Sequence, residues 1–315
     1  MEEKSIADKK LEAAEESFGM EYELTPKERA EVRERYAKVY FPDPVKEPLW
    51  FGRRDHQRIS DKLAIFDQRA EVVAGSPAVF GICSERYKIV PFEDIVHMTE
   101  QSVGKLEGYG KIQICPHTYL EGARMKISIK FPEMPHLIKK VDSIIPKVEV
   151  FTSYDLSTKL MGRFGAFQLK CTNGMGVWKT FKKFAKRHLQ NLFLNELGEN
   201  ISSGLLLFGD QVNQWKQWGE RQIDQRIYEA MWDELPFSTA ERVKIEALPE
   251  IGTNLVLSQA VQKGVDLWSI NSVLTQFATH EVKSELRRID LEPAIARVME
   301  SVFSGNIQPK LDKVA

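Results

Sequence analysis

Cysteine is scarce in this chain of 315 residues, and long apolar runs are absent. The three cysteines, Cys83, Cys115 and Cys171, are odd in number and widely spaced, which argues against a disulfide scaffold and for a reducing compartment. No run reaches the ~18 apolar residues that a membrane helix needs. The charged first residues are not typical of a signal peptide. We therefore predict a cytoplasmic protein of a bacterial host cell, with no membrane partner.

Motifs for metal, nucleotide and covalent chemistry are also missing. The sequence has no CxxC or HxxxH spacing for a metal, and its glycine-rich stretches lack the Lys-Ser/Thr pair of a P-loop. Cys83 and Cys171 follow apolar strand residues, where cysteine behaves as a small hydrophobic side chain. We therefore predict no metal, no cofactor and no catalytic residue, and we favour binding over catalysis.

Carboxylates are missing between Asp155 and Glu196, although the chain as a whole is close to neutral. Its 44 Lys and Arg residues face 45 Asp and Glu residues. The stretch 156–195 carries eight of those cations and no anion, so it has a formal charge of +8 while the rest of the chain has −9. A segregated charge attracts anions locally even on a nearly neutral molecule.

Strand patterns precede helix patterns along the chain. Alternation of apolar and polar residues predicts a hairpin from 111–118 and 124–131, and a second pair of strands from 147–154 and 163–171. After Gly176 the apolar period becomes 3.6, which predicts a helix over 177–197 and further helices to about residue 303. We predict an α+β fold, with a twisted antiparallel sheet, helices packed on one face, and a helical C-terminal half.

The same changes of pattern divide the chain into four parts. A capping box at Thr25 starts a helix in the first part, and the aromatic stretch 48–52 is expected to plug into the body. In the second part, residues 86–90 are expected to pair with the strand 78–83. The predicted parts are a helical N-terminal arm (1–55), an antiparallel sheet plus helix core (56–200), a helical C-terminal region (201–304) and a tail (305–315).

The basic segment gives the candidate site. In the predicted helix, four lysines recur at i, i+3, i+4 and i+7 and would share one face. Cations with nearby aromatic rings, including Phe164, suit a single-stranded backbone with stacked bases. A solvated face that pairs with acidic residues of the same molecule or of another subunit explains the pattern equally well. The candidate nucleic-acid-binding residues are Lys159, Arg163, Lys170, Trp178, Lys179, Lys182, Lys183, Lys186, Arg187 and His188.

Five short motifs resemble those of a known family. They are Ser-Glu-Arg-Tyr-Lys at 84–88, Ser-Tyr-Asp-Leu-Ser at 153–157, Cys-Thr-Asn-Gly at 171–174, Arg187-His188, and the stretch 268–275 with His280. Their order and spacing are similar to the phage/plasmid-like family catalogued as domain of unknown function 932. That family has no agreed activity, so the resemblance implies a mobile-element origin. By analogy of fold, its members look like neighbours of phage strand-annealing proteins.

We therefore predict a non-catalytic single-stranded nucleic-acid-binding protein of a phage or plasmid, acting in replication or recombination, for instance in strand annealing. Two alternatives stay open. One is a structural or interaction protein that assembles through its basic surface. The other is a metal-dependent nuclease using acids such as Asp67 and Asp155. Trp215 and Trp218 lie three residues apart on a predicted helix and suit core packing or a subunit contact, so we also expect a homo-oligomer.

Overall fold

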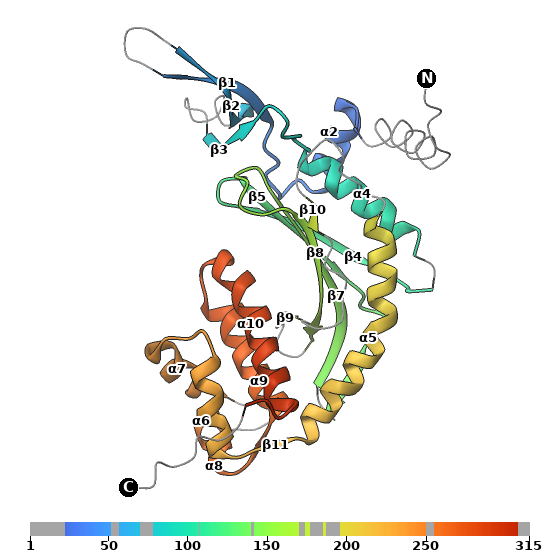
Figure 1. The fold of residues 1–315 in the computed structure, drawn as a ribbon. Helices are drawn as coiled ribbons and strands as arrows, with labels where there is room; N and C mark the ends of the chain where they lie inside the picture. Colours follow the sequence, from blue (N-terminus) through green and yellow to red (C-terminus); the bar gives the residue numbers. More distant parts are fainter. Residues whose placement is uncertain are drawn as a thin grey trace, which may run out of the picture.

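The computed structural model describes residues 23–51, 57–69, 78–106, 108–139, 142–169, 174–176, 185–186, 196–249 and 255–307. They form an elongated molecule with a small sheet at one end, a large curved sheet in the middle and a group of helices at the other end (Figure 1). Antiparallel strands in the first half and helices in the second confirm the α+β class.

The N-terminal end combines two helices with a three-stranded antiparallel sheet of order β1-β2-β3. The capping box predicted at Thr25 is present. The structure differs from our expectation at 86–90, which form no strand, because β3 pairs with the longer β2 and the chain then turns directly into a helix. The elements are α2 (Pro26–Arg35), β1 (Pro44–Phe51), β2 (Gln57–Asp67), β3 (Ala78–Ser84) and α4 (Phe92–Gly104).

Residues 44–51 are also a strand rather than part of a helical arm. The aromatic stretch does not plug into the body at Trp50, whose surface is 60% exposed. Edge pairing of β1 with β2 satisfies the backbone there without burying that ring.

The large sheet has the strand order β10-β8-β7-β5-β4, with β6 also paired to β7 and β9 to β8. All its described pairings are antiparallel. Both predicted strand pairs are confirmed. The strands are β4 (Gln113–Tyr119), β5 (Arg124–Lys130), β6 (His136–Lys139), β7 (Asp142–Ser153), β8 (Leu160–Gln168), β9 (Gly174–Gly176) and β10 (Ala185–Lys186).

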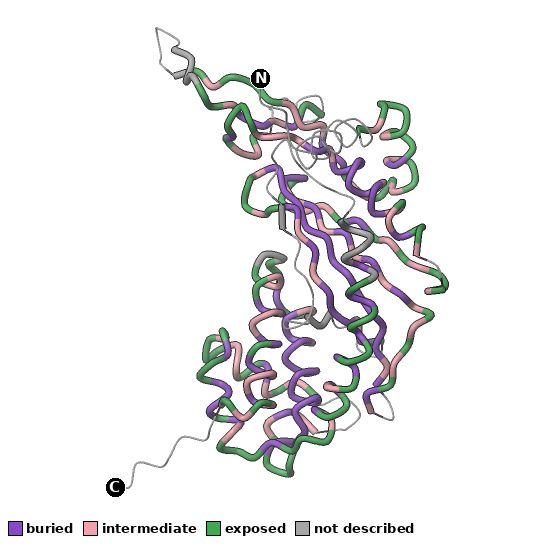
Figure 2. Tube along the Cα trace, turned by 45° about the vertical axis from the view of Figure 1, so that its right-hand side comes forward, coloured by how far each residue is buried: buried purple, intermediate pink, exposed green. Residues whose placement is uncertain are grey.

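The two faces of this sheet differ in chemistry. On β5, Met125, Ile127 and Ile129 are fully buried, while the residues between them are only half-buried. Helices α4 and α5 (Glu196–Glu220) cover the apolar face and share its hydrophobic core. Figure 2 shows the buried residues running along the sheet and the adjoining side of α5. The opposite side, the polar face, points away from α4 and α5.

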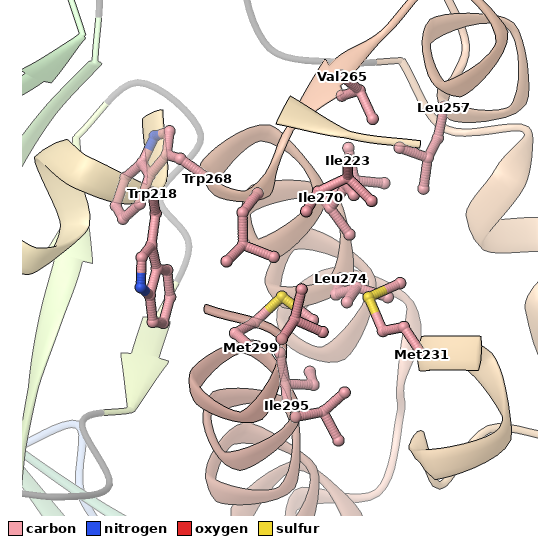
Figure 3. Packing of buried hydrophobic residues seen from close by; sticks show 14 of the residues in the cluster. Trp218, Ile223, Met231, Leu257, Val265, Trp268, Ile270, Leu274, Ile295 and Met299 are labelled. Atoms are coloured by element: carbon pink, nitrogen blue, oxygen red, sulfur yellow. The ribbon is translucent and has the colours of Figure 1, made fainter. Parts of the chain in front are cut away.

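The C-terminal helices pack around a second core, which Figure 3 shows from close by. Trp215 and Trp218 are both buried in it, so neither is available as the surface contact between subunits that we considered. The elements are β11 (Gln222–Ile223), α6 (Gln225–Glu234), α7 (Thr239–Glu246), α8 (Leu257–Gln262), β12 (Val265–Asp266), α9 (Leu267–Gln276), the π-helix η1 (Phe277–Glu281) and α10 (Glu285–Phe303).

The helix expected over 177–197 is wrong at residues 185–186. These form β10 and pair with β8, Lys186 lying opposite Leu160. Apolar spacing alone favours a helix there, but the open edge of β8 offers backbone partners that the local pattern does not reveal. Residues 177–184 and 187–195 lie outside the described part of the chain.

Candidate functional site

A pocket of about 140 Å³ lies on the polar face of the large sheet. Strands β5, β7 and β8 form its floor, and the end of η1 with the first turns of α10 forms its wall. Figure 1 shows α10 and α5 on opposite sides of this sheet. We call this hollow the sheet pocket. Its lining residues are Lys126, Ser128, Lys130, Lys147, Glu149, Arg163, Phe167, Thr279, Arg288, Ile289 and Glu292.

Strand register explains why charged side chains meet there. Residues directly opposite one another in an antiparallel pair share a face of the sheet. Ser128 of β5 is opposite Glu149 of β7, which is opposite Arg163 of β8. One step along, Lys130 is opposite Lys147. Period-2 alternation therefore carries the polar residues of three strands into one patch.

Arg163 joins the floor of the pocket to its wall. Its Nε donates to Glu149 Oε2 at 2.7 Å, and its Nη1 donates to the carbonyl oxygen of Ile289 at 2.9 Å. Its Nη2 donates to Glu292 Oε2 at 2.8 Å. The planar guanidinium can serve three acceptors at once because its N–H groups point in fixed directions. This one side chain thus links α10 to the sheet.

Glu149 is the buried anion of the pocket. Lys147 Nζ lies 3.1 Å from its Oε1, and Arg163 binds the other oxygen. Burial alone would raise the pKa of this carboxyl, but Lys147, Arg163 and Lys126 outweigh that effect and hold its pKa well below the ordinary range. Glu149 is therefore a carboxylate at neutral pH and compensates part of the cationic charge around it.

The remaining charge of the pocket is positive. Lys130 Nζ lies 3.7 Å from the centre of the Phe167 ring, and burial is the main cause that lowers the pKa of Lys130. The lining residues include five cations and two carboxylates, so the formal net charge of the pocket is +3. Such a concave, positive surface attracts multiply charged anions.

The polar face continues beyond the pocket onto β4. His117 is opposite Lys126, and Tyr119 is opposite Arg124. The two rings are nearly parallel, at 12°, with centres 6.3 Å apart. His117 is exposed and Tyr119 is partly exposed, so flat aromatic surface lies beside the cations of β5.

Three of the ten predicted site residues fall in the described part of the chain. Lys159 is exposed in the loop before β8, Arg163 lines the sheet pocket, and Lys186 lies on β10. Because Lys186 is on a strand, it cannot complete the helical face of four lysines. Lying outside the described residues are Lys170, Trp178, Lys179, Lys182, Lys183, Arg187 and His188.

Phe164 does not fit the role of a base-stacking ring. It is 3% exposed and lies on the apolar face of the sheet, where its ring meets Gly204 of α5. Side chains alternate along a strand, so Phe167, three residues further, is on the other face and lines the pocket instead.

Most residues of the pocket were missed by our sequence reasoning. Lys126 and Lys130 alternate with buried residues in the predicted hairpin, and that signal was sufficient to place them on one face. Thr279, Arg288 and Glu292 carry no such signal, because they reach the pocket only through the packing of η1 and α10 against the sheet.

The motif at 153–157 has a structural role. The Ser153 hydroxyl donates to the carbonyl of Thr158 and accepts from its N–H, both at 3.0 Å. Asp155 accepts hydrogen bonds from Ser157 N and from Arg124 Nε. These bonds build the tight turn between β7 and β8, so the Ser153 hydroxyl is used inside the loop rather than presented to a phosphate.

The motif at 268–275 is also structural. Trp268 is fully buried, and its Nε1 donates to Asp142 Oδ2 at 2.8 Å. Gln168 Nε2 donates to the other oxygen of that carboxylate at 2.9 Å. The motif therefore fastens α9 to the ends of β7 and β8. His280 lies exposed in η1, close in sequence to the pocket residue Thr279.

These features define an α+β protein with a cationic pocket between an antiparallel sheet and a C-terminal helix. The chain belongs to the family described as Domain of unknown function (DUF932), whose model matches residues 79–298. No curated protein and no solved structure matches the chain.

Two further findings concern the described residues alone. None of their helices combines the length and hydrophobicity needed to cross a bilayer. No group of three or more His, Cys, Asp or Glu side chains among them is arranged to hold a metal ion.

Proposed function

We propose that this protein binds single-stranded nucleic acid along the polar face of its large sheet, with the sheet pocket at the centre of the interface. The observation that carries the proposal is the row of lysines on neighbouring strands, Lys126 and Lys130 on β5 with Lys147 on β7. A net positive lining beside aromatic rings matches what a flexible, polyanionic strand requires.

The aromatic rings beside the lysines favour a nucleic acid over other polyanions as the ligand. The His117 and Tyr119 rings adjoin the cations of β5, and each nucleic-acid base has a flat face that such rings can bind. Heparin-like or polyphosphate chains have no such faces. The strand would place phosphates near the lysines and bases on the β4 side.

Two described lysines of the basic segment 156–195 lie at one edge of the large sheet. Lys159 and Lys186 lie near each other at the paired ends of β8 and β10, on the edge of the same sheet. Lys159, exposed in the loop before β8, would lengthen the cationic track at that end of the sheet.

The biological part of the proposal rests on the family resemblance. We place the protein in the replication or recombination of a phage or plasmid, in the cytoplasm of the host, as a homo-oligomer that performs no bond-making chemistry. Strand annealing is the form of this role that the fold analogy favours.

The test is a binding titration with a fluorescent oligothymidine at several salt concentrations. In Lys126→Gln/Lys130→Gln, binding should weaken, and the slope of log K against log salt should flatten by about 1.4, since each phosphate contact on a single strand contributes about 0.7. Lys244→Gln, an exposed lysine on α7, is the matched control and should bind like the wild type.

Two outcomes would contradict the proposal. One is an affinity of the double variant equal to that of the wild type, with its fold intact by circular dichroism. The other is wild-type binding that does not change with salt, because phosphate contacts always release counterions.

A further inference from the structure

Some of the charged side chains of the sheet pocket are buried, unlike those of the open surface around it. Lys147 is 5% exposed and Glu149 is 4% exposed, although both line the pocket. Through its bonds to Ile289 and Glu292, Arg163 ties the strand below to the helix above. An anionic group that reaches Lys147 must therefore leave bulk water, and it will do so only if its charge is well compensated.

The charge of the lining favours a dianion. A phosphodiester within a strand carries one negative charge, whereas a phosphate monoester carries about −1.5 to −2 at pH 7. The formal charge of the lining is +3. A monoester therefore neutralises more of the net positive charge of the lining than a phosphodiester does.

The shape of the pocket favours a group with a single attachment. A phosphodiester continues on both sides, so the strand must enter and leave the same space. With the sheet below, α10 above and the Arg163 bridge between them, a group held by one bond is easier to admit. The volume of about 140 Å³ is sufficient for a phosphate group with a few water molecules.

Donors for such a group are already present. The Lys147 ammonium has three protons and uses one for Glu149, and Lys130 stands next to it across the strand pair. Ser128, Thr279 and Arg288, whose side chains carry hydroxyl or guanidinium donors, also line the space. These are the groups that bind phosphate oxygens in proteins.

We infer that the sheet pocket receives the terminal phosphate monoester of a nucleic-acid strand, so that the protein prefers a phosphorylated strand end. This inference rests on the proposed function, since it assumes that the strand lies on the polar face. It adds that one particular group of the strand enters the pocket.

The experiment compares three unlabelled oligonucleotides of one sequence as competitors of the fluorescent oligothymidine. They carry a 5′-phosphate, a 3′-phosphate or no terminal phosphate. The full chain should bind one phosphorylated form about tenfold more tightly than the unphosphorylated form, a difference of about 1.4 kcal/mol. In Lys147→Met, the phosphorylated and unphosphorylated strands should compete equally, whatever the effect of the change on overall affinity.

Two further variants make the result interpretable. Lys147→Met/Glu149→Gln removes both members of the buried ion pair, so it avoids leaving an uncompensated carboxylate and should also lose the preference. Lys244→Met on α7 should keep it. Equal competition by all three strands against the wild type would overturn the inference and leave the proposed function in place.

Other outcomes separate the two proposals. If both Lys147 variants still prefer the phosphorylated strand, the inference is also overturned, because another surface must then bind the terminal phosphate. If the wild type binds none of the three strands, the proposed function fails and the inference fails with it. Saturable binding of inorganic phosphate in that case, lost in Lys147→Met, would identify a free anion as the ligand of the pocket.

Discussion

Arg163 of β8 donates a hydrogen bond to Glu292 of α10 at 2.8 Å, although 129 positions separate the two residues. This bond and the one to the carbonyl of Ile289 hold the helix above the sheet. Glu292 is thus both a structural anchor and an anion inside a pocket that we propose to be an anion site. These two roles oppose each other and can be separated by mutation.

Glu292→Gln should strengthen nucleic-acid binding. The amide can still accept from Arg163, but the formal charge of the lining rises from +3 to +4. We expect a gain of about fivefold in affinity, or about 1 kcal/mol. The measurement is the oligothymidine titration, with Glu300→Gln on the same helix as the control because Glu300 binds Gln214 away from the pocket. Unchanged or weaker binding in Glu292→Gln would contradict the electrostatic argument.

Trp268→Phe should destabilise the protein, because it removes a buried hydrogen bond and also puts a smaller ring into the core. The change removes the Nε1 donor from Asp142, which is buried and keeps the Gln168 amide as a partner. Losing a hydrogen bond to a buried carboxylate costs about 1–3 kcal/mol. Urea unfolding of the variant measures this loss. Trp50→Phe, at an exposed position, should stay within about 0.5 kcal/mol of the wild type.

Gly204→Ala should disturb the packing of α5 on the sheet. A Cβ at this position would lie 2.0 Å from the Phe164 ring. Overpacking of this kind costs about 1–3 kcal/mol. Gly209→Ala on the same helix meets nothing within 4 Å and should stabilise the protein by about 0.5–1 kcal/mol. Thermal unfolding of both variants tests whether the first change lowers stability and the second raises it.

A double variant identifies the clashing partner. If the strain arises at Phe164, Gly204→Ala should be partly rescued by Phe164→Leu, so the two changes should not be additive. Strict additivity of their effects on the free energy of unfolding would show that the cost has another origin.

Two buried glutamates should give opposite pH dependences of stability. The pKa of Glu149 is lowered in the folded state, because its cationic neighbours outweigh the effect of burial. Its contribution is therefore fully present above its unfolded pKa of about 4.3 and is lost as the pH falls below that value. The stability advantage of the wild type over Glu149→Gln should shrink in acid.

The contribution of Glu93 to stability should depend on pH in the opposite direction. Burial raises its pKa in the folded protein, in spite of its ion pair with Arg33. Folding then disfavours the charged form, so the wild type should lose stability relative to Glu93→Gln as the pH rises above about 4.3. Urea titrations of the wild type and the two variants, at acidic and neutral pH, check both signs. If the stabilities of the wild type and both variants changed with pH in parallel, the two predictions would be contradicted.

Local patterns were enough for the elements whose partners are close in sequence. The alternation in 124–131 correctly predicted β5 and its hairpin with β4, because side chains on a strand must point to alternate faces. The capping box at Thr25 correctly predicted the start of α2, because a helix start is decided within one turn.

The sequence patterns predicted the wrong structure where backbone far away in the sequence offered hydrogen-bond partners. Residues 185–186 fit an amphipathic helix, yet they pair with β8 because that edge is available only in the folded sheet. Residues 86–90 were expected beside 78–83, but β2 is the strand that pairs with β3. Pairing choices of this kind depend on which strand edges meet in space.

The amino-acid sequence by itself determined the α+β class, the two faces of the central sheet and which residues carry charge, since these follow from periodicity and residue type. Only the tertiary structure decided which ionic partners each charged side chain has. Arg163 belongs to the basic segment in sequence, but packing of α10 places it between Glu149 and Glu292. Electrostatic partners are set by distance in space, and for charges on separate elements that distance exists only after the helix and the sheet have come together.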